Sequence, residues 1–367
     1  MNLGLVIYGS LDQMTGGYRY DHQLVTHLRQ QGDRVEIFSL PWQSYLRHLG
    51  QNFSRRLDRW IESSGVDLLL EDELNHPSLF LANRRLRRPQ LPLVSIVHHL
   101  RSSELWSPVA LAAYRLVERA YLRSVDAVVC NSRPTLAAAQ SLAGRPLRGL
   151  IAWPGAHRHQ QRVTPDQVTA RAHEPGPLRL LYLGAIVPRK GLDVLLQALA
   201  RLPAGSARLT VVGEAHRDPG YARRMAHRAH QLPLPVAFLG PVPDEQLDGL
   251  LASHQVLAIP SQHEGFGIGY LEGMGSGMVC LASASGGASD LVRDGVEGFL
   301  IPAGAESLLA EYLGRLHADR ALLARMGVAG LERARRHPTW EASAHQIRQF
   351  LEQCIRQTAS VGAAAGW

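Results

Sequence analysis

The sequence predicts an α/β protein with two doubly wound parallel-sheet domains and a ligand cleft between them. Short runs of Val, Ile and Leu alternate with helical patterns, which is typical of parallel strands joined by crossover helices. The alternation stops after residue 155 and starts afresh near residue 178, and 367 residues suffice for two domains. Ligands of such sheets bind beyond the carboxyl ends of the strands, so we expect the function between the two halves.

The N-terminal half opens with an apolar run followed by a helical pattern. Residues 18–32 place Leu24, Val25 and Leu28 at helical spacing and end near a glycine. An arginine-rich helical region extends to Ser64. The strands predicted in this half lie at residues 3–8, 34–40, 66–70, 93–97 and 127–130.

The C-terminal half repeats the same pattern. Its predicted helices include residues 191–202 and 268–277, and the chain becomes helical again after residue 304. The polar segment 156–177 has scattered prolines and predicts a linker between the halves. The strands predicted in this half lie at residues 178–184, 207–213, 235–240, 256–261 and 279–283.

Charge narrows the class of partner. The chain has 39 Lys and Arg against 32 Asp and Glu, and residues 1–175 hold nearly all of the excess. The arginine clusters at residues 55–59 and 84–88 lack the interleaved aromatics of a single-strand nucleic-acid platform, so we predict no nucleic-acid partner. The basic half is compatible with a peripheral contact at an anionic membrane face or with an acidic substrate, although a solvated surface explains it better.

Cysteine usage and hydropathy indicate the compartment. Cys130, Cys280 and Cys354 form no CxxC pair, which argues against a disulfide framework and a structural zinc site. The first residues resemble a strand rather than a signal peptide, and no apolar run approaches the roughly 18 residues of a spanning helix. We therefore expect a cytoplasmic protein, with a peripheral place at the inner membrane face left open.

The segment GAIVPRKG, at residues 184–191, follows the first strand of the second half. Lys190 is the only lysine among the 39 cationic residues, and it stands beside Arg189. Two cations at a strand-to-helix turn suit a diphosphate, because backbone amides at a helix N-terminus also favour anions. The GxxxxGK[ST] order of a P-loop is absent, so we predict a diphosphate cradle of another kind.

The segment at residues 260–277 carries two glutamates among many glycines. Glu264 follows a strand directly, and Glu272 comes eight residues later. If the stretch between them is helical, the carboxylates are separated by about 12 Å along the axis, which suits two hydroxyl-bearing rings on either side of a diphosphate. Phosphate oxygens would then sit at the backbone amides of Gly265, Phe266 and Gly267.

Two features of the N-terminal half also follow strands. Gly16 and Gly17 precede the first helix, where amides can face an anion, although a tight turn with positive φ explains them equally well. The GxGxxG fingerprint of a dinucleotide site is absent at this turn. His98 and His99 follow the strand at residues 93–97 and should project from its carboxyl end, although a lone histidine is more often structural.

Several segments together resemble a known family. In order and spacing, GAIVPRKGLDVLLQAL, VVGE, FLGPVPDEQL, IPSQHEGFGIGYLEGMGSGMVCLAS and GGASDLVRDGVEGFLIP are similar to the C-terminal domain of family 4 (GT4) retaining glycosyltransferases. That family has the GT-B fold, with two facing Rossmann-like domains and an interdomain cleft. The resemblance covers roughly residues 175–305 through the E-x7-E pair Glu264 and Glu272. It extends more weakly over the N-terminal half through Gly16-Gly17, His98 and AVVCNS.

The resemblance implies a role for each residue. Lys190 would bind the donor diphosphate, Glu264 the donor sugar hydroxyls and Glu272 the ribose. The loop around Val242 would hold the base through its backbone, and His98 would lie near the reacting centre. The implied catalytic residues are His98, Lys190 and Glu264. The implied donor-binding residues are Gly16, Gly17, Arg189, Lys190, Val242, Glu264, Gly265, Phe266, Gly267 and Glu272.

This sequence departs from the family at one place. The family commonly has arginine directly after the first glycine of the turn at Gly184, and here that place is Ala185. Arg189 is the candidate replacement.

The segment EDELNHPS, at residues 71–78, ends another strand with three acids. A metal-binding DxD reading fails on the order of residues, and GT-B enzymes generally work without a metal, so we predict no metal site. The predicted acceptor-binding residues are Asp72, Glu73, Asn75 and His76.

The resemblance also implies a domain arrangement. The predicted domains are residues 1–165 on the acceptor side and residues 176–337 on the nucleotide-sugar side. The helical stripe that begins with Trp340 would return to the N-terminal domain as a third segment, residues 338–358.

The activity implied is that of a metal-independent, retaining hexosyltransferase without a cofactor. It would move a sugar from a UDP- or GDP-linked donor to a hydroxyl of a glycan, a lipid-linked acceptor or a small molecule. Two other functions stay open. A GT-B nucleotide-sugar epimerase would need an acid and a base on opposite faces of the sugar, and a non-catalytic partner subunit would bind the donor without turnover.

Overall fold

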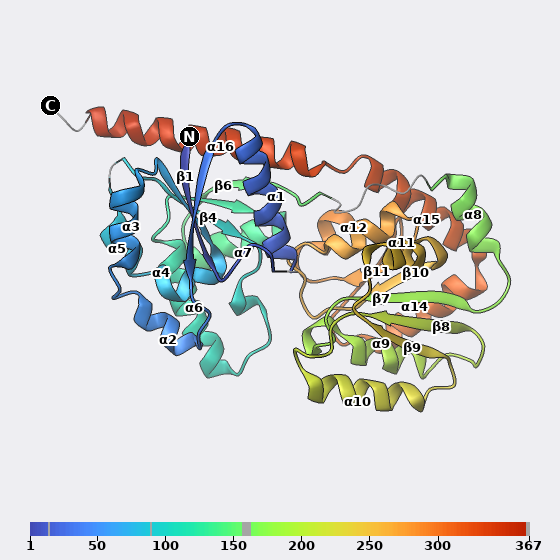
Figure 1. Ribbon diagram of the computed structural model, residues 1–367. Helices are drawn as coiled ribbons and strands as arrows, with labels where there is room; N and C mark the ends of the chain where they lie inside the picture. The colour runs from blue at the N-terminus through green and yellow to red at the C-terminus, as the bar shows by residue number, and fades with distance from the viewer. Residues whose placement is uncertain (14, 89, 156–162, 365–367) are drawn as a thin grey trace. The chain divides into compact units, whose positions relative to one another are not determined.

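The computed structural model describes residues 1–13, 15–88, 90–155 and 163–364. The chain folds into two compact units, which can be followed by the colours along the chain in Figure 1. The first unit contains Met1–Gly155 and Pro338–Trp367, and the second contains Ala156–His337. In the described part, each unit is built on a six-stranded parallel sheet.

The first unit has the strand order β2-β1-β3-β4-β5-β6. Its strands are β1 (Asn2–Tyr8), β2 (Arg34–Leu40), β3 (Leu68–Asp72), β4 (Leu93–Val97), β5 (Ala127–Cys130) and β6 (Arg148–Ile151). Its helices are α1 (Gly16–Gln30), α2 (Tyr45–Gln51), α3 (Arg56–Ser64), η1 (Glu73–Asn75), α4 (His76–Leu79), α5 (Ala82–Leu86), η2 (Arg101–Ser103), α6 (Pro108–Leu122), α7 (Arg133–Ala143) and α16 (Trp340–Ala364).

The second unit has the strand order β12-β11-β10-β7-β8-β9. Its strands are β7 (Leu178–Leu183), β8 (Ala207–Val212), β9 (Val236–Gly240), β10 (Val256–Ile259), β11 (Val279–Ser283) and β12 (Gly298–Ile301). Its helices are α8 (Pro165–His173), η3 (Pro188–Lys190), α9 (Leu192–Leu199), α10 (Pro219–His230), α11 (Asp244–Ser253), α12 (Ile268–Gly275), α13 (Ala288–Leu291), α14 (Glu306–Ala318) and α15 (Arg320–Arg335).

Each sheet has a switch point, where the chain leaves two neighbouring strands toward opposite edges. In the first unit it lies between β1 and β3, because β1 pairs with β2 on its other side and β3 with β4. In the second unit it lies between β7 and β10. Loops that follow such strands diverge and leave room for a ligand at the carboxyl edge of the sheet.

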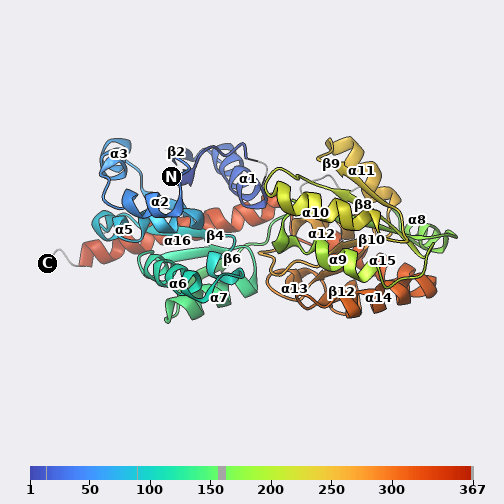
Figure 2. The same cartoon turned by 90° about the horizontal axis from the view of Figure 1, so that it is seen from below.

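Alternate residues of β1 show why the first sheet needs helices on both faces. Leu5 and Ile7 belong to a buried cluster that includes residues of α1 and α16, whereas Val6 belongs to a second cluster with residues of α3 and α6. A strand buried on both sides reads as a continuous apolar run, as residues 3–8 do. Figure 2 shows the same elements from below.

The predicted strands are confirmed, with small shifts and two omissions. β3 ends two residues later than predicted and includes Asp72. β6 and β12 were not predicted, because each has four residues and contains glycine, so neither gives a clear strand pattern.

The prediction of a continuous linker over residues 156–177 is wrong in part. Residues 156–162 lie outside the described residues, but α8 occupies Pro165–His173. A capping box between Thr164 and Gln167 starts this helix, and a proline at its first position fits the same start. The buried Arg171 donates hydrogen bonds to the carbonyls of Ala252, Ser276 and Gly277, which attaches α8 to the second unit.

The helix α16 packs within the first unit. Ile347 and Leu351 are buried in the cluster that contains Leu5, and Arg348 donates to both carboxylate oxygens of Asp33, at 2.7 and 3.2 Å. No helix in the described part of the chain is long and apolar enough to span a bilayer.

Candidate functional site

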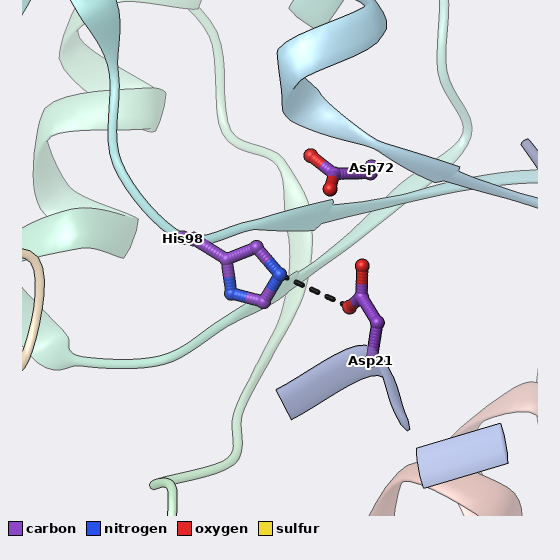
Figure 3. A group of neighbouring side chains, drawn as sticks. All are labelled: Asp21, Asp72 and His98. Atoms are coloured by element: carbon purple, nitrogen blue, oxygen red, sulfur yellow. Dashed lines mark hydrogen bonds and ion pairs between the residues drawn. The ribbon is translucent and has the colours of Figure 1, made fainter. Parts of the chain in front are cut away.

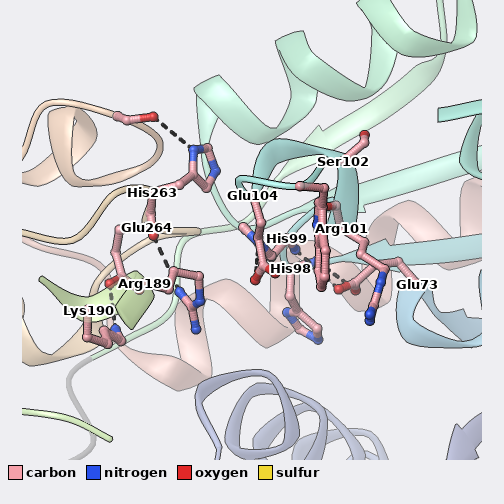
Figure 4. Close-up of polar contacts among 12 residues, drawn as sticks. Glu73, His98, His99, Arg101, Ser102, Glu104, Arg189, Lys190, His263 and Glu264 are labelled. Atoms are coloured by element: carbon pink, nitrogen blue, oxygen red, sulfur yellow. Dashed lines mark hydrogen bonds and ion pairs between the residues drawn. The ribbon is translucent and has the colours of Figure 1, made fainter. Parts of the chain in front are cut away.

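The second unit brings together the two loops that follow its switch-point strands. Lys190 ends the turn after β7, and Glu264 lies in the loop after β10. The Lys190 Nζ donates to Glu264 Oε2 at 2.6 Å, and Ser261 Oγ donates to the same oxygen at 3.3 Å (Figure 4). The site therefore pairs the only lysine of the sequence with the first glutamate of the E-x7-E pattern.

Glycines allow this close approach of backbone to backbone. A Cβ at Gly191, whose φ is +70°, would lie 2.1 Å from the carbonyl oxygen of Pro260. A Cβ at Gly286 would lie 2.0 Å from the carbonyl oxygen of Glu264, and one at Gly287 would lie 2.1 Å from that of Gly265. The loop carrying Glu264 is thus held between the turn before α9 and the loop after β11, and side chains at these glycines would displace it.

Arg189 contacts the same loop. Its Nη1 donates to the carbonyl of His263 at 3.4 Å, and its own carbonyl accepts from the amide of Gln262 at 2.8 Å. Ala185, at the place of the family arginine, accepts a hydrogen bond through its carbonyl from the Tyr182 hydroxyl. The guanidinium of Arg189, which lies at the opposite end of the turn from Ala185, is therefore beside the loop that carries Glu264.

The helix that carries Glu272 begins later than the sequence suggested. α12 starts at Ile268, and Gly267, with φ +94°, forms its N-cap. Residues 264–267 are not helical, so the axial separation of about 12 Å assumed for the two carboxylates does not apply over the whole interval. Glu272 is buried within α12. The first turn of α12 has no acidic residue, which leaves its amide end suited to an anion.

Val242 lies in the short connection between β9 and α11. In the part of the chain that the structure describes, its backbone amide and carbonyl form no hydrogen bond. Both groups are therefore available to a ligand, and the role of Val242 in holding the base stays a prediction.

The first unit places His98 at the carboxyl end of β4, and its ring contacts α1. His98 Nε2 donates to Asp21 Oδ1 at 3.0 Å, and both residues are buried (Figure 3). The His98 amide donates to Glu73 Oε2 at 2.9 Å, and the His98 carbonyl accepts from Asn131 Nδ2 at 2.8 Å. Backbone and ring are therefore both fixed from neighbouring elements.

Electrostatics favour the charged form of His98. Burial alone would lower the pKa of His98, but the charge and hydrogen bond of Asp21, with Glu73 and Asp72, raise it to about 10. Burial also raises the pKa of Asp72 well above its usual range, and the neighbouring carboxylates add to this. At neutral pH His98 is therefore the charged imidazolium beside Asp21, and its surroundings shift Asp72 toward the protonated form.

Gly16 and Gly17 form the first turn of α1, capped by Thr15. Neither has positive φ, so the tight-turn explanation is wrong for both of these described residues. Gly17 has another reason to be glycine, because a Cβ there would lie 3.1 Å from Cδ2 of His98.

The residues predicted to bind the acceptor are buried after β3. Glu73 accepts from the amides of His98 and His99, and Asp72 Oδ1 accepts from the amide of Leu74. Asn75 Nδ2 donates to the carbonyl of Val6, at 2.8 Å. These contacts hold the segments after β3 and β4 together and attach them to β1.

His76 is enclosed in the same region. Its Nδ1 contacts the carbonyl of Glu73 at 2.9 Å, its Nε2 contacts the Tyr45 hydroxyl at 3.2 Å, and burial lowers its pKa to about 3. Asp72 Oδ2 and Asn75 Oδ1 differ from these groups, since both are buried without a partner among the described residues.

Two residues of the first unit were missed in the sequence. Asp21 lies on the buried face of α1 with Leu24 and Leu28, and an acid inside an apolar stripe is a detectable signal. Glu118, on α6, is buried and accepts from the amides of Arg101 and Ser102 at 2.6 and 3.1 Å. It fixes the start of η2, directly after the two histidines.

Asp21, Asp72 and His98 also have the arrangement of metal ligands. One oxygen from each carboxylate and a ring nitrogen lie within 4.8 Å of one another, the one such group among the described residues. A metal ion would have to displace the proton of His98 Nε2, and the raised pKa of His98 opposes this. The expectation of no metal stays a prediction.

Comparisons with known proteins match both halves of the chain. A family model described as glycosyl transferases group 1 matches residues 165–333, and one described as a glycosyl transferase 4-like domain matches residues 14–151. A D-inositol 3-phosphate glycosyltransferase of Nocardia farcinica is 34% identical over 54% of this chain and 45% of its own length. A phosphatidyl-myo-inositol mannosyltransferase of Mycobacterium leprae is 27% identical over 96% of both chains. The chain spans 43% to 48% of the length of the first four curated relatives it matches.

Solved structures share the fold. Sucrose-phosphate synthase from Thermosynechococcus elongatus has a TM-score of 0.81, 22% identity, and coverage of 97% of this chain and 99% of its own. HepE from Anabaena, in complex with UDP and glucose, has a TM-score of 0.74, 22% identity, and coverage of 96% and 100%. The predicted GT-B fold, with two α/β parallel-sheet units, is confirmed.

Proposed function

This chain belongs to the group 1, GT4-like glycosyl transferases, and we propose that it moves a sugar from a nucleotide-diphosphate donor to a hydroxyl acceptor. The observation that carries the proposal is the ion pair between Lys190 and Glu264 at the switch point of the second sheet. A cation and a carboxylate at that edge match the two ends of a sugar diphosphate, one anionic and one rich in hydroxyl donors.

The donor would bind to the second unit. Lys190 and Arg189 would hold the diphosphate, and the amides of Gly265, Phe266 and Gly267 would hold its remaining oxygens. Glu264 would accept hydrogen bonds from the sugar hydroxyls, Glu272 from the ribose, and the backbone near Val242 would hold a UDP- or GDP-type base. In the absence of a ligand, Glu264 neutralises Lys190 at 2.6 Å, so binding exchanges this partner for phosphate oxygens.

Leaving-group stabilisation in this proposal is electrostatic. Breaking the bond between the sugar and the phosphate leaves negative charge on the diphosphate, and fixed cations and amides stabilise that charge as it develops. These groups can do this without a metal ion, so we propose a metal-independent reaction with no cofactor. By family membership we propose a hexosyl donor and retention of configuration.

The acceptor would bind to the first unit, beside His98. The four predicted acceptor residues are all buried and therefore expose little surface to a ligand: Asp72, Glu73, Asn75 and His76. Of these four, Asp72 and Asn75 each have an oxygen without a partner among the described residues, Oδ2 and Oδ1, to which an acceptor hydroxyl could donate. Gly16 and Gly17 would bring the first turn of α1 close to His98.

We also propose a cytoplasmic location, with a peripheral place at the inner membrane face. It is supported by the three cysteines, Cys130, Cys280 and Cys354, which are buried and unpaired.

A nucleotide-sugar panel tests the proposal. The purified protein is mixed with UDP- and GDP-linked sugars without metal, and thermal shift and donor hydrolysis are measured beside Lys190→Ala. Arg201→Ala is the matched control, because Arg201 lies just beyond α9 in an exposed ion pair with Glu306. We expect one donor to raise the melting temperature of the wild type and of the control, and both proteins to hydrolyse that donor slowly. Lys190→Ala should show neither effect. Epimerised donor would indicate the epimerase, and binding without any turnover would indicate the partner subunit.

A further inference from the structure

The helix α6 exposes an apolar face that the first unit does not cover. Val109 is 82% exposed and Leu116 is 70% exposed, and Leu105, just before the helix, is 75% exposed. In the second unit, the exposed large apolar residues Leu239 and Val296 reach only 41%. Side chains of this size stabilise a protein by about 1.5–3 kcal/mol each when buried, so leaving three of them exposed calls for a partner.

The helical spacing places this apolar face beside a row of cations. Val109, Ala112 and Leu116 recur at intervals of three and four residues, so they share one side of α6. Arg115 and Arg119 lie next to this stripe and are also exposed. Glu118, Tyr121 and Leu122 fill the opposite, buried side. α6 thus has the pattern of an interfacial helix, with apolar side chains bordered by arginine.

A cavity of about 560 Å³ opens beside this face. Another cavity, of about 670 Å³, lies on the second unit and is unrelated to the face. The cavity beside the face lies among η2, α6 and α7. Its polar lining consists of the serines Ser102, Ser103 and Ser141 and the arginines Arg115 and Arg119, and Leu116 lies at the same cavity. Three hydroxyls and two guanidinium groups suit a phosphate group.

The arginines of this cavity also lack an anion within the protein. Among the described residues, neither Arg115 nor Arg119 forms an ion pair, and like charges at this spacing repel each other on a helix. Arg123, one turn further, differs because its Nε donates to the carbonyl of Ala143 at the end of α7. Arg123 therefore has a structural role, whereas Arg115 and Arg119 are available to a bound anion.

We propose that η2 and α6 form a docking face for an anionic phospholipid bilayer. A headgroup phosphate occupies the cavity between Arg115 and Arg119, and Leu105, Val109 and Leu116 enter the acyl boundary. Charge complementarity decides in favour of this occupant, because Arg115 and Arg119 border the apolar stripe of α6, whereas Glu104, the carboxylate next to Leu105, is already paired with His99 at 3.2 Å. Phosphate and hydrocarbon occur together in a lipid surface and not in a free phosphate.

The proposal also bears on the acceptor. η2 follows His98 and His99 directly, and Glu118 of α6 holds its first amides. A lipid bound here therefore presents its headgroup hydroxyls to the loop that carries His98. This assignment of the lipid as acceptor rests on the proposed glycosyl transfer, whereas the docking itself does not.

Vesicle sedimentation tests the docking. The full chain is incubated with phosphatidylcholine vesicles, with and without phosphatidylglycerol. The variants are Arg115→Gln/Arg119→Gln and Val109→Ser/Leu116→Ser. The matched controls in the second unit are Arg228→Gln/Arg325→Gln and Leu239→Ser, which change exposed residues of the same types. We expect binding only to the anionic vesicles, and a loss of about 30-fold for the arginine pair, since each arginine near such a surface contributes about fivefold. The apolar pair should lose about tenfold or more, and the controls should bind as the wild type does.

Three results would overturn the proposal. One is equal binding by the wild type and both α6 variants. Another is full competition by soluble glycerol phosphate, which would indicate a free-phosphate site. The third is a change from dimer to monomer in the α6 variants without vesicles, which would make the face a protein interface. Donor hydrolysis is measured on the same samples. A wild type that hydrolyses the donor but does not bind the vesicles would contradict the docking proposal and leave the transferase assignment standing.

Discussion

The ring of His98 lies against the backbone of Gly17, so that a methyl group at position 17 would sit 3.1 Å from the His98 Cδ2. The first turn of α1, which follows β1, and the end of β4 are thereby fitted to each other at the carboxyl edge of the first sheet. Gly17 is therefore explained by this approach to a side chain rather than by an unusual backbone conformation.

Gly17→Ala should therefore damage activity more than stability. The added Cβ must push the imidazole by a few tenths of an ångström, and small displacements of a reacting group are costly, so we expect a loss of about tenfold or more in kcat. Gly50→Ala on α2 is the matched control, since nothing lies within 4 Å of its added Cβ. Steady-state kinetics with the donor found in the panel measure both, and equal rates for the two variants would contradict the role of Gly17.

Asp21→Asn should lower the pKa of His98. The carboxylate supplies the main opposition to the burial that otherwise depresses this pKa, so its loss should bring the titration down from about 10 toward or below neutrality. Histidine ring signals in NMR spectra, with His98→Gln to identify the resonance, measure the change. A His98 that already titrates near its ordinary value in the wild type would contradict the assignment.

The same pair predicts how stability depends on pH. A folded pKa raised above the unfolded value of 6.5 means that the contribution of His98 is fully present below pH 6.5 and is lost as pH rises through about 10. The difference in unfolding free energy between wild type and His98→Gln should therefore shrink from pH 6.5 to pH 10. Urea unfolding across this range measures it, and a difference that grows with pH would reverse the sign of the argument.

Gly286→Ala should disturb the loop that carries Glu264. Its φ of +89° and a Cβ only 2.0 Å from the Glu264 carbonyl oxygen leave no space for a methyl group, so we expect a cost of about 1–3 kcal/mol or a displaced loop. Donor affinity and urea unfolding measure the two effects. Gly314→Ala, which meets nothing within 4 Å, should leave both unchanged. Normal donor affinity in Gly286→Ala would show that the loop does not position Glu264.

Arg171→Met should destabilise the second unit. Burial lowers the pKa of Arg171 to about 10, and its guanidinium serves three carbonyl groups that would otherwise lack these donors. We expect a loss of about 3 kcal/mol or more in unfolding free energy. Arg325→Met on the same unit is exposed and should change little. Equal stability of the two variants would mean that α8 is not held in this way.

The sequence was most informative where a local pattern determines the structure. Apolar runs such as residues 3–8 predicted strands, and the position of Lys190 and Glu264 after two strands predicted their place at the sheet edge. The capping box at Thr164 was present in the sequence, but the surrounding polar residues obscured the helix that it starts. Single side chains such as Arg171 attach that helix, and periodicity does not show such contacts.

The part of the site that was missed depends on residues far apart in the chain. Asp21 meets His98 across 77 positions, and Gly286 meets Glu264 across two loops. The meaning of a buried acid or a glycine in such a place depends on the partner that the fold brings to it. The same limit holds for residues 72–76, because their polar pattern predicted acceptor binding but did not show the contacts by which the fold uses these side chains to join neighbouring segments.

The most direct test of the central claim uses the chemistry of Lys190, the only lysine in the sequence. The protein is acylated with an amine-specific reagent in the presence and absence of UDP, GDP and their sugars, and modification of Lys190 is measured by mass spectrometry, with the N-terminal amine as reference. We predict that one nucleoside diphosphate protects Lys190 strongly and leaves the reference amine unaffected. Equal modification of Lys190 with every nucleotide at saturating concentration would contradict the claim that Lys190 holds the donor diphosphate.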